Sequence, residues 1–219
     1  MIYALARQAT KLFLRICFRI EVVNLDGLPR SGPVIVAANH QSFCDSLFLP
    51  VVLPRRVTFL AKAEYFDHWH TSVFMRSIGQ IPIRRGTGSE AIRAIATATD
   101  LLHEGAVLAL YPEGTRSLDG SVHRGHVGIA RLALATGAAV VPIGLRGTQA
   151  VQPVGSRMLR PFRRVEVHVG QARYISPADV EAAGAKKLAL RGFTDAVMGD
   201  IAVLSGRAYV DSYLKSPEG

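Results

Sequence analysis

The chain has 219 residues, 49% of them hydrophobic and 20% charged, and its net charge of +9 comes from 26 Lys and Arg residues against 17 Asp and Glu residues. This length suits one domain with a sizeable core, and the basic balance favours anionic partners such as phosphorylated small molecules or acidic lipid head groups. The sequence has no long Lys/Arg run, RNA-binding aromatic signature or zinc-finger spacing, which argues against nucleic acid. Its two cysteines form no CxxC pair, which argues against a disulfide framework or a structural zinc site.

Residues 1–20, MIYALARQATKLFLRICFRI, are predicted to form an amphipathic helix. Positive charges recur at every fourth residue: Arg7, Lys11, Arg15 and Arg19. This spacing places the charges in one stripe on a mostly apolar helix, a pattern typical of a segment that lies in a membrane interface. A terminal helix packed on the domain with its basic side in water is the alternative. Because no stretch reaches the roughly 18 uncharged apolar residues of a spanning helix, docking is favoured over spanning.

After residue 20, segments with strand character alternate with segments of helical periodicity. Strands are predicted at 33–38, 57–62, 80–85, 106–112, 139–145 and 164–170, and helices from about 42 and at 70–79, 89–104, 126–136 and 186–205. Such alternation is typical of an α/β domain with a mostly parallel central sheet flanked by helices. We therefore expect an interface helix at 1–20, an α/β domain at 21–205 and a polar C-terminal tail at 206–219.

The first candidate site is NHQSFCD, which follows the strand predicted at 33–38. Ligands of open parallel sheets bind beyond the carboxyl ends of the strands, so polar residues there are candidates for function. From the turn, the His40 ring could fold back so that Nδ1–H meets the Asp45 carboxylate, which leaves Nε2 free to take a proton. Ser42 and Asp45 also resemble a capping box at a helix start. On this stretch alone, a capping acid beside an incidental histidine explains the residues equally well.

Two further strand ends carry candidate anion-binding residues. In YPEGTRS, Gly114 and Thr115 belong to a sharp turn, and Arg116 offers a planar fork for a phosphate. Glu113 could accept hydrogen bonds from a polyol or hold Arg116 in place. In IPIRR, alternation favours Arg85 as the arginine that faces the cleft. Solvated surface side chains are the alternative at both places.

Four segments in this order, NHQSFCD, GQIPIRR, YPEGTRS and VVPIGL, resemble the motifs of glycerolipid acyltransferases of the lysophosphatidate acyltransferase (PlsC-like) type. The resemblance covers roughly residues 20–200. It implies transfer of a fatty acyl group from acyl-CoA or acyl carrier protein to the free sn-2 hydroxyl of 1-acylglycerol-3-phosphate, which gives phosphatidate. It also implies direct attack without an acyl-enzyme, no metal or other cofactor, and a peripheral or monotopic position on an anionic membrane surface at the cytoplasmic face.

The same resemblance gives roles to single residues. His40 would be the general base and Asp45 its partner, and Pro142 would shape the pocket from the fourth motif. The remaining site residues would bind the phosphate and glycerol of the acceptor: Glu113, Gly114, Thr115, Arg116, Arg85 and Lys62.

Several alternatives stay open at this point. The same chemistry could act on glycerol-3-phosphate or another lysophospholipid, because the motifs read a hydroxyl and a phosphate but not the rest of the acceptor. An acyl-thioester hydrolase and a non-catalytic lipid-binding protein are further possibilities. GTGSEA matches a dinucleotide-binding turn, but a lone match is weak. HWH and HRGH lack partners at metal-ligand spacing, and the absence of GxSxG argues against a serine hydrolase.

Overall fold

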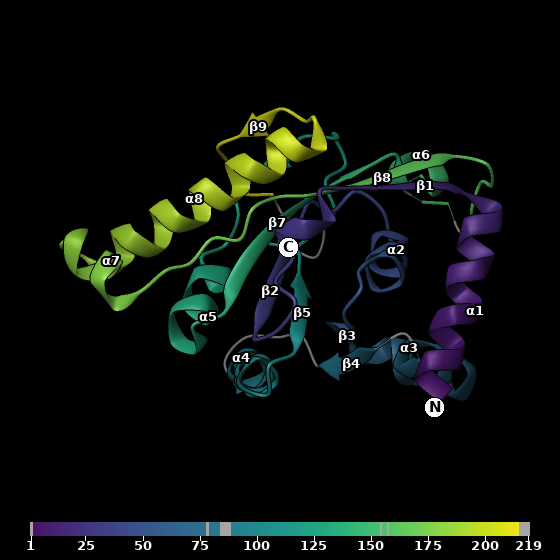
Figure 1. Ribbon diagram of the computed structural model, residues 1–219, viewed down its shortest axis with the longest axis horizontal. Coiled ribbons are helices and arrows are strands. Elements are labelled where there is room, and N and C mark those ends of the chain that lie inside the picture. Colours follow the sequence, from purple (N-terminus) through teal and green to yellow (C-terminus); the bar gives the residue numbers. More distant parts are fainter. Residues whose placement is uncertain (1, 78, 84–88, 154, 157, 215–219) are drawn as a thin grey trace.

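A computed structural model describes residues 2–77, 79–83, 89–153, 155–156 and 158–214, and shows a twisted sheet covered by helices on both faces (Figure 1). The central sheet has seven strands in the order β1-β8-β7-β2-β5-β3-β4. All neighbouring strands are parallel except β7 and β8. Their bounds are β1 Arg19–Val23, β2 Val34–Ala38, β3 Val57–Lys62, β4 Gln80–Ile83, β5 Val107–Leu110, β7 Ala139–Arg146 and β8 Arg164–Val169. The predicted α/β class with a mostly parallel sheet is therefore confirmed.

The helices cover the sheet unequally. One face packs against α4, α5 and α8, and the other against α2, with α1 outside α2. The described helices are α1 Ile2–Cys17, α2 Asp45–Val52, α3 Trp69–Ser77, α4 Ser89–His103, α5 Gly128–Thr136, α6 Thr148–Val151, α7 Pro177–Ala182 and α8 Lys186–Ser205, with short 3-10 turns η1 Leu25–Gly27 and η2 Ala63–Phe66. Because β2 is buried on both faces, its sequence VIVAA is uniformly apolar rather than alternating.

The described structure departs from the expected elements at both ends of the chain. The N-terminal helix ends at Cys17, and Arg19 already belongs to β1, which pairs in parallel with β8. Near the C-terminus, β9 (Tyr209–Val210) pairs with β6 (Val122–His123) inside the segment expected to be a polar tail. Both β1 and β9 are short, and their hydrogen-bond partners lie far away in sequence, so local patterns do not reveal them.

The N-terminal helix packs on the domain along only part of its surface. Its Leu14 side chain and the following Phe18 are buried against Phe48 and Val51 of α2, so the helix packs on the domain. Four large apolar side chains of the helix are exposed: Leu5, Leu12, Phe13 and Ile16. Within the described residues, no helix combines the length and apolar character needed to cross a membrane.

Candidate active site

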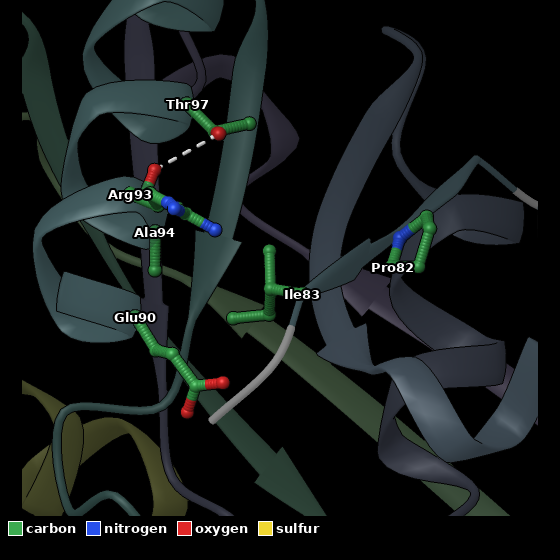
Figure 2. Close-up of a pocket in the computed structure, with 6 residues that line it drawn as sticks. All are labelled: Pro82, Ile83, Glu90, Arg93, Ala94 and Thr97. Atoms are coloured by element: carbon green, nitrogen blue, oxygen red, sulfur yellow. Dashed lines mark hydrogen bonds between the residues drawn. The ribbon is translucent and has the colours of Figure 1, made fainter. Parts of the chain in front are cut away.

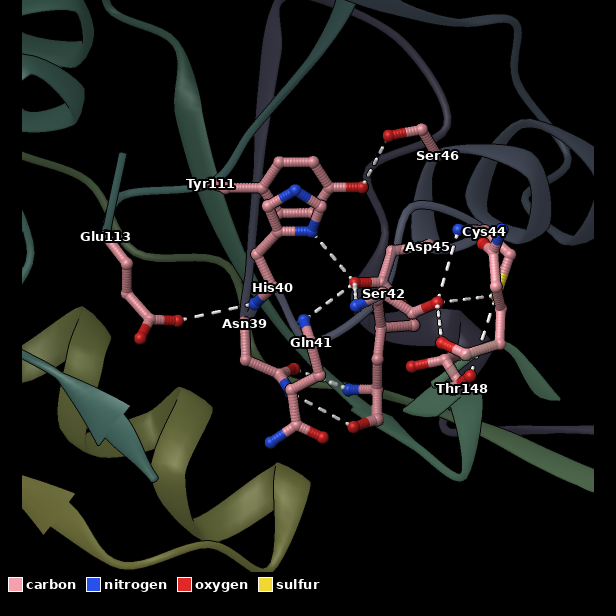
Figure 3. A network of polar contacts seen from close by, with 12 residues as sticks. Asn39, His40, Gln41, Ser42, Cys44, Asp45, Ser46, Tyr111, Glu113 and Thr148 are labelled. Atoms are coloured by element: carbon pink, nitrogen blue, oxygen red, sulfur yellow. Dashed lines mark hydrogen bonds and ion pairs between the residues drawn. The ribbon is translucent and has the colours of Figure 1, made fainter. Parts of the chain in front are cut away.

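The predicted His40–Asp45 pair is formed in the structure (Figure 3). His40 lies two residues beyond β2, and its Nδ1 is 2.9 Å from Oδ2 of Asp45, the first residue of α2. The same Oδ2 accepts the backbone N–H groups of Gln41 and Ser42, each at 2.9 Å. Because a carboxylate oxygen only accepts, Nδ1 carries the hydrogen and Nε2 keeps its lone pair. Asp45 is fully buried while the His40 side chain is 17% exposed, so the imidazole can meet a substrate.

The capping box expected at Ser42 is not formed as predicted. The helix begins at Asp45 with Cys44 as its N-cap, and the Ser42 hydroxyl donates to the Gln152 carbonyl at 2.9 Å. Of the two hydrogen bonds of a capping box, only one exists, in which the Asp45 carboxylate accepts the Ser42 N–H. Burial raises the pKa of the Cys44 thiol to about 12, so this cysteine stays protonated and is a poor nucleophile.

Tyr111 fixes the plane of the His40 ring. The two rings are stacked with centroids 3.8 Å apart and planes 7° from parallel. Tyr111 directly follows β5, and its hydroxyl lies 2.9 Å from Oγ of Ser46 in α2. Burial raises the pKa of Tyr111 well above its usual value, so the phenol stays neutral beside the carboxylate of Asp45. The imidazole is therefore held at its edge by Asp45 and across its face by Tyr111.

Asn39 connects the turn that carries His40 to the fourth motif. Its buried amide donates from Nδ2 to the Leu145 carbonyl at 3.0 Å and accepts the Leu145 N–H at Oδ1 at 2.7 Å. Leu145 lies near the carboxyl end of β7, so this pair joins the ends of β2 and β7. Sequence reasoning did not assign a role to Asn39 or Tyr111, although both lie within or beside the quoted motifs.

Glu113 is buried between two backbone segments. Its Oε1 accepts the N–H of His40 at 3.3 Å, and its Oε2 accepts the N–H of His123 at 3.0 Å. Only 2% of the residue is exposed, and burial raises its pKa to about 7 despite these two hydrogen bonds. These contacts favour a structural bridge between the turn after β2 and the segment after β5. The interaction with Arg116 that the sequence suggested is replaced by backbone contacts.

The rest of the third motif lies against the same turn. The Ser117 N–H donates to the His40 carbonyl at 2.8 Å, which brings the exposed Arg116 beside the His40 turn. Gly114 has φ +78°, and a Cβ atom there would lie 3.3 Å from the His126 ring. Thr115 is half-buried between Gly114 and Arg116. The turn therefore brings Gly114 and the exposed Arg116 close to the backbone of His40.

The remaining predicted residues occupy different surroundings. Lys62 is the last residue of β3, which is separated from β2 by β5. Arg85 lies outside the described residues. Pro142 is buried within β7, pairs with Ala37, and its carbonyl accepts the Gly170 N–H at 2.8 Å. Any influence of Pro142 on the pocket would therefore act through the strand.

The histidines set aside at the sequence level also have identified contacts. Nε2 of His123 lies 3.0 Å from Oδ2 of Asp119, and the Ser117 hydroxyl donates to Asp119 at 2.9 Å. His126 stacks on Tyr213 with ring centroids 5.1 Å apart. Within the described part of the chain, no group of three or more His, Cys, Asp or Glu side chains is placed to hold a metal ion. The Asp119–His123 pair, which sequence reasoning missed, stabilises the loop that contains the third motif.

A separate cavity of about 220 Å³ opens between β4 and α4 (Figure 2). Pro82 and Ile83 of β4 form one side of it. The other side comes from one face of α4: Glu90, Arg93, Ala94 and Thr97. Pro82 and Ile83 are in the middle of the second motif, so the cavity lies beside that motif, and its lining joins an apolar wall to charged side chains.

Comparisons with known proteins show which proteins this chain is similar to. A family model described as Acyltransferase matches residues 19–146. The chain is 32% identical to the chloroplastic 1-acyl-sn-glycerol-3-phosphate acyltransferase LPAT1 of Arabidopsis thaliana over 164 residues, which cover 74% of this chain and 46% of the relative. It is 30% identical to the 1-acyl-sn-glycerol-3-phosphate acyltransferase of Bacillus subtilis over 148 residues, which cover 66% of this chain and 71% of the relative.

The fold also resembles a solved structure. The crystal structure of the 1-acyl-sn-glycerophosphate acyltransferase PlsC from Thermotoga maritima superposes with a TM-score of 0.67, covers 94% of this chain and 79% of that chain, and is 24% identical in sequence. The aligned part of this chain spans about half the length of the plant relatives. The chain belongs to the acyltransferase family.

Proposed function

We propose that this chain transfers a fatty acyl group from an acyl thioester to the free sn-2 hydroxyl of 1-acylglycerol-3-phosphate, giving phosphatidate. One observation carries this proposal: His40 is oriented by buried Asp45 and leaves Nε2 available at the carboxyl edge of the sheet. Membership of the family and the names of its relatives support the substrate class. A site with an oriented base but without a positioned nucleophile suits a reaction in which the substrate supplies the hydroxyl.

The proposed reaction moves one proton twice. Nε2 of His40 takes the proton from the sn-2 hydroxyl as its oxygen attacks the thioester carbonyl. The carbon–sulfur bond then breaks, and the imidazolium returns the proton to the departing thiolate. Asp45 stabilises the intermediate imidazolium, and Tyr111 keeps the ring plane fixed. General-base assistance of this kind contributes about 10²–10⁴-fold to a rate.

We propose that the acceptor phosphate is anchored by the third motif. Arg116 is exposed beside the His40 turn, and its planar fork suits a phosphate with close to two negative charges. Gly114 and Thr115 would let the backbone approach the ligand, and we propose Arg85 and Lys62 as further phosphate-binding cations. Glu113 acts in this scheme by holding the His40 backbone. Anchoring the phosphate places the hydroxyl, and such positioning contributes on the order of several kcal/mol.

The donor and the membrane complete the proposal. Acyl-CoA or acyl carrier protein would bring the activated acyl group, so the transfer needs neither a metal nor a redox cofactor. The exposed apolar side chains of α1 alternate with its basic residues, which favours peripheral or monotopic docking on an anionic surface at the cytoplasmic face of a membrane.

The decisive assay follows thiol release from long-chain acyl-CoA in liposomes, with wild type and His40→Ala. The acceptor is lysophosphatidate, glycerol-3-phosphate, lysophosphatidylcholine or none. We expect release that requires lysophosphatidate and disappears in the variant. Release with another acceptor would keep the mechanism and change the substrate, whereas release without any acceptor would favour a hydrolase. Silence with acyl-CoA and with acyl carrier protein donors would favour a binding protein.

A further inference from the structure

The connection between α6 and β8 ends in an exposed tip that is both apolar and basic. We define this tip as residues 158–163. Met158 is 79% exposed and Phe162 is 76% exposed. Arg160 and Arg163 are exposed beside them. Large apolar side chains at such exposure forgo the burial that normally stabilises them, and several together often mark a contact surface.

The backbone holds this tip in an unfavourable conformation. Phe162 has φ +63°, a region that residues with a Cβ atom rarely adopt and that costs about 1 kcal/mol or more without compensation. Its N–H donates to the Cys17 carbonyl at 2.6 Å, and the Arg163 carbonyl accepts the Arg19 N–H at 3.1 Å. Leu159 packs beneath into the cluster that anchors α1. The surrounding contacts therefore turn the phenylalanine outward instead of letting it relax into the core.

The tip continues the exposed surface of α1. Ile16 is the last exposed apolar residue of that helix. The next residue, Cys17, accepts the Phe162 N–H at its carbonyl oxygen. At the other end of α1, the adjoining α3 presents Trp69, which is 80% exposed, and Val73. Figure 1 shows α1 along one edge of the molecule, with α3 near its N-terminal end and the α6–β8 connection near its C-terminal end. Apolar side chains interspersed with Arg and Lys along one edge match the chemistry of an anionic bilayer surface.

We propose that the tip is a second membrane-contact element. Met158 and Phe162 enter the boundary between head groups and acyl chains, and Arg160 and Arg163 pair with lipid phosphates. This inference rests on the interface role proposed for α1 and extends it beyond that helix. A single interfacial helix leaves the domain free to roll about the helix axis. A second contact at the end of α1 removes that freedom and fixes the direction in which the His40 site faces the bilayer.

The first test measures binding to vesicles by sedimentation, with phosphatidylcholine containing about one third phosphatidylglycerol. The variant Met158→Ser/Phe162→Asn removes both apolar side chains, and asparagine tolerates a positive φ better than phenylalanine. We expect vesicle affinity to fall about tenfold or more while the thermal midpoint of unfolding stays equal or rises. The matched control is Leu188→Ser/Val203→Ser, which removes residues 65% and 77% exposed on α8 and should bind as wild type. Equal binding by the tip variant would overturn the proposal.

Two further measurements separate the contributions. Arg160→Ser and Arg163→Ser should each weaken binding to these vesicles about fivefold at low salt and much less to pure phosphatidylcholine. The chain has one tryptophan, so Trp69→Phe/Phe162→Trp places the sole indole in the tip. Brominated lipids should quench its fluorescence in the bound state, and an unquenched signal would contradict insertion.

The same variants distinguish other occupants of the tip. Unchanged vesicle binding with activity lost only for an acyl carrier protein donor would indicate a protein-docking surface. A changed sedimentation coefficient without lipid would indicate contact between copies of the chain. Either result would refute membrane insertion. None of the binding measurements depends on catalysis, so failure of the proposed acyl transfer would leave them interpretable.

Discussion

Replacing Asp45 with asparagine removes a negative charge from the site and keeps almost the same shape. Oδ2 accepts three hydrogen bonds, from Nδ1 of His40 and from the N–H groups of Gln41 and Ser42. An amide oxygen can occupy that position, which leaves the amide NH₂ where Oδ1 now lies. Oδ1 is buried and lacks a hydrogen-bond partner among the described residues. The variant therefore keeps the imidazole orientation, loses the charge and buries an unsatisfied donor.

The size of the effect follows from these contacts. A charge-assisted hydrogen bond contributes roughly 1.5–3 kcal/mol and a neutral one about 1 kcal/mol, so stabilisation of the His40 imidazolium falls by about 1–2 kcal/mol. We expect kcat to fall about 5- to 30-fold. A loss on the order of 10⁴-fold would require the amide to turn its NH₂ toward His40 and enforce the wrong tautomer. That rotation would oppose two backbone N–H donors, those of Gln41 and Ser42, and is disfavoured.

The assay is thiol release at saturating acyl-CoA and lysophosphatidate, with thermal unfolding measured on the same samples. Burying the unsatisfied NH₂ should cost about 1–3 kcal/mol in the free energy of unfolding, so the variant must be assayed well below its midpoint. Asp200→Asn is the control, because Asp200 lies on α8, where it pairs with Arg173 and not with His40. Activity of Asp45→Asn within threefold of wild type would refute the role given to the carboxylate.

Three further predictions concern the surroundings of His40. Tyr111→Phe keeps the stacked ring, so its kcat should stay within about threefold of wild type. Tyr111→Leu removes the ring that fixes the imidazole plane and should lower kcat about tenfold. Equal kcat values for the two variants would contradict the stacking role. The pKa of Glu113 is raised from 4.5 to about 7 in the folded state, so between these pH values the folded chain binds a proton that the unfolded chain does not. The free energy of unfolding should therefore fall by about 3 kcal/mol as pH rises from about 4.5 to 7, and should level off above that. Thermal unfolding of Glu113→Gln should lack this slope, and parallel profiles for the two proteins would refute it. Arg116→Ala should raise KM for lysophosphatidate about 10- to 100-fold and should also lower kcat, because the phosphate positions the hydroxyl; Arg116→Lys should lie between Arg116→Ala and wild type. An unchanged KM would mean that the phosphate binds elsewhere.

The His40–Asp45 pair was predictable because it is local. The two residues are five apart, and the turn between them lets the side chains meet without help from the rest of the fold. The support of the pair was not predictable in this way. Asn39 binds the backbone of Leu145, 106 residues later, and the N–H of His40 binds Glu113, 73 residues later. Such contacts depend on which strands become neighbours, and the order of parallel strands is not written in any one segment.

The strands missed at the sheet edges have a similar explanation. Arg19 and Ile20 continue the apolar and basic pattern of the N-terminal helix, yet they belong to β1. This strand forms by pairing with β8, in which Arg164, the partner of Arg19, lies 145 residues later in the chain. The central strands were found because burial on both faces makes them continuously apolar. β1 lacks that signal, because its residues are exposed or only half-buried.

The two sequence interpretations of Asp45, a capping acid or a catalytic partner, are not exclusive in the structure. Its Oδ2 binds the backbone N–H groups at the start of α2 and the His40 ring at the same time. The oxygen that accepts these N–H groups also orients the imidazole. Helix initiation and base orientation thus depend on one buried oxygen. Removing it with alanine would disturb the turn and the chemistry together, and only the isosteric asparagine can separate the two.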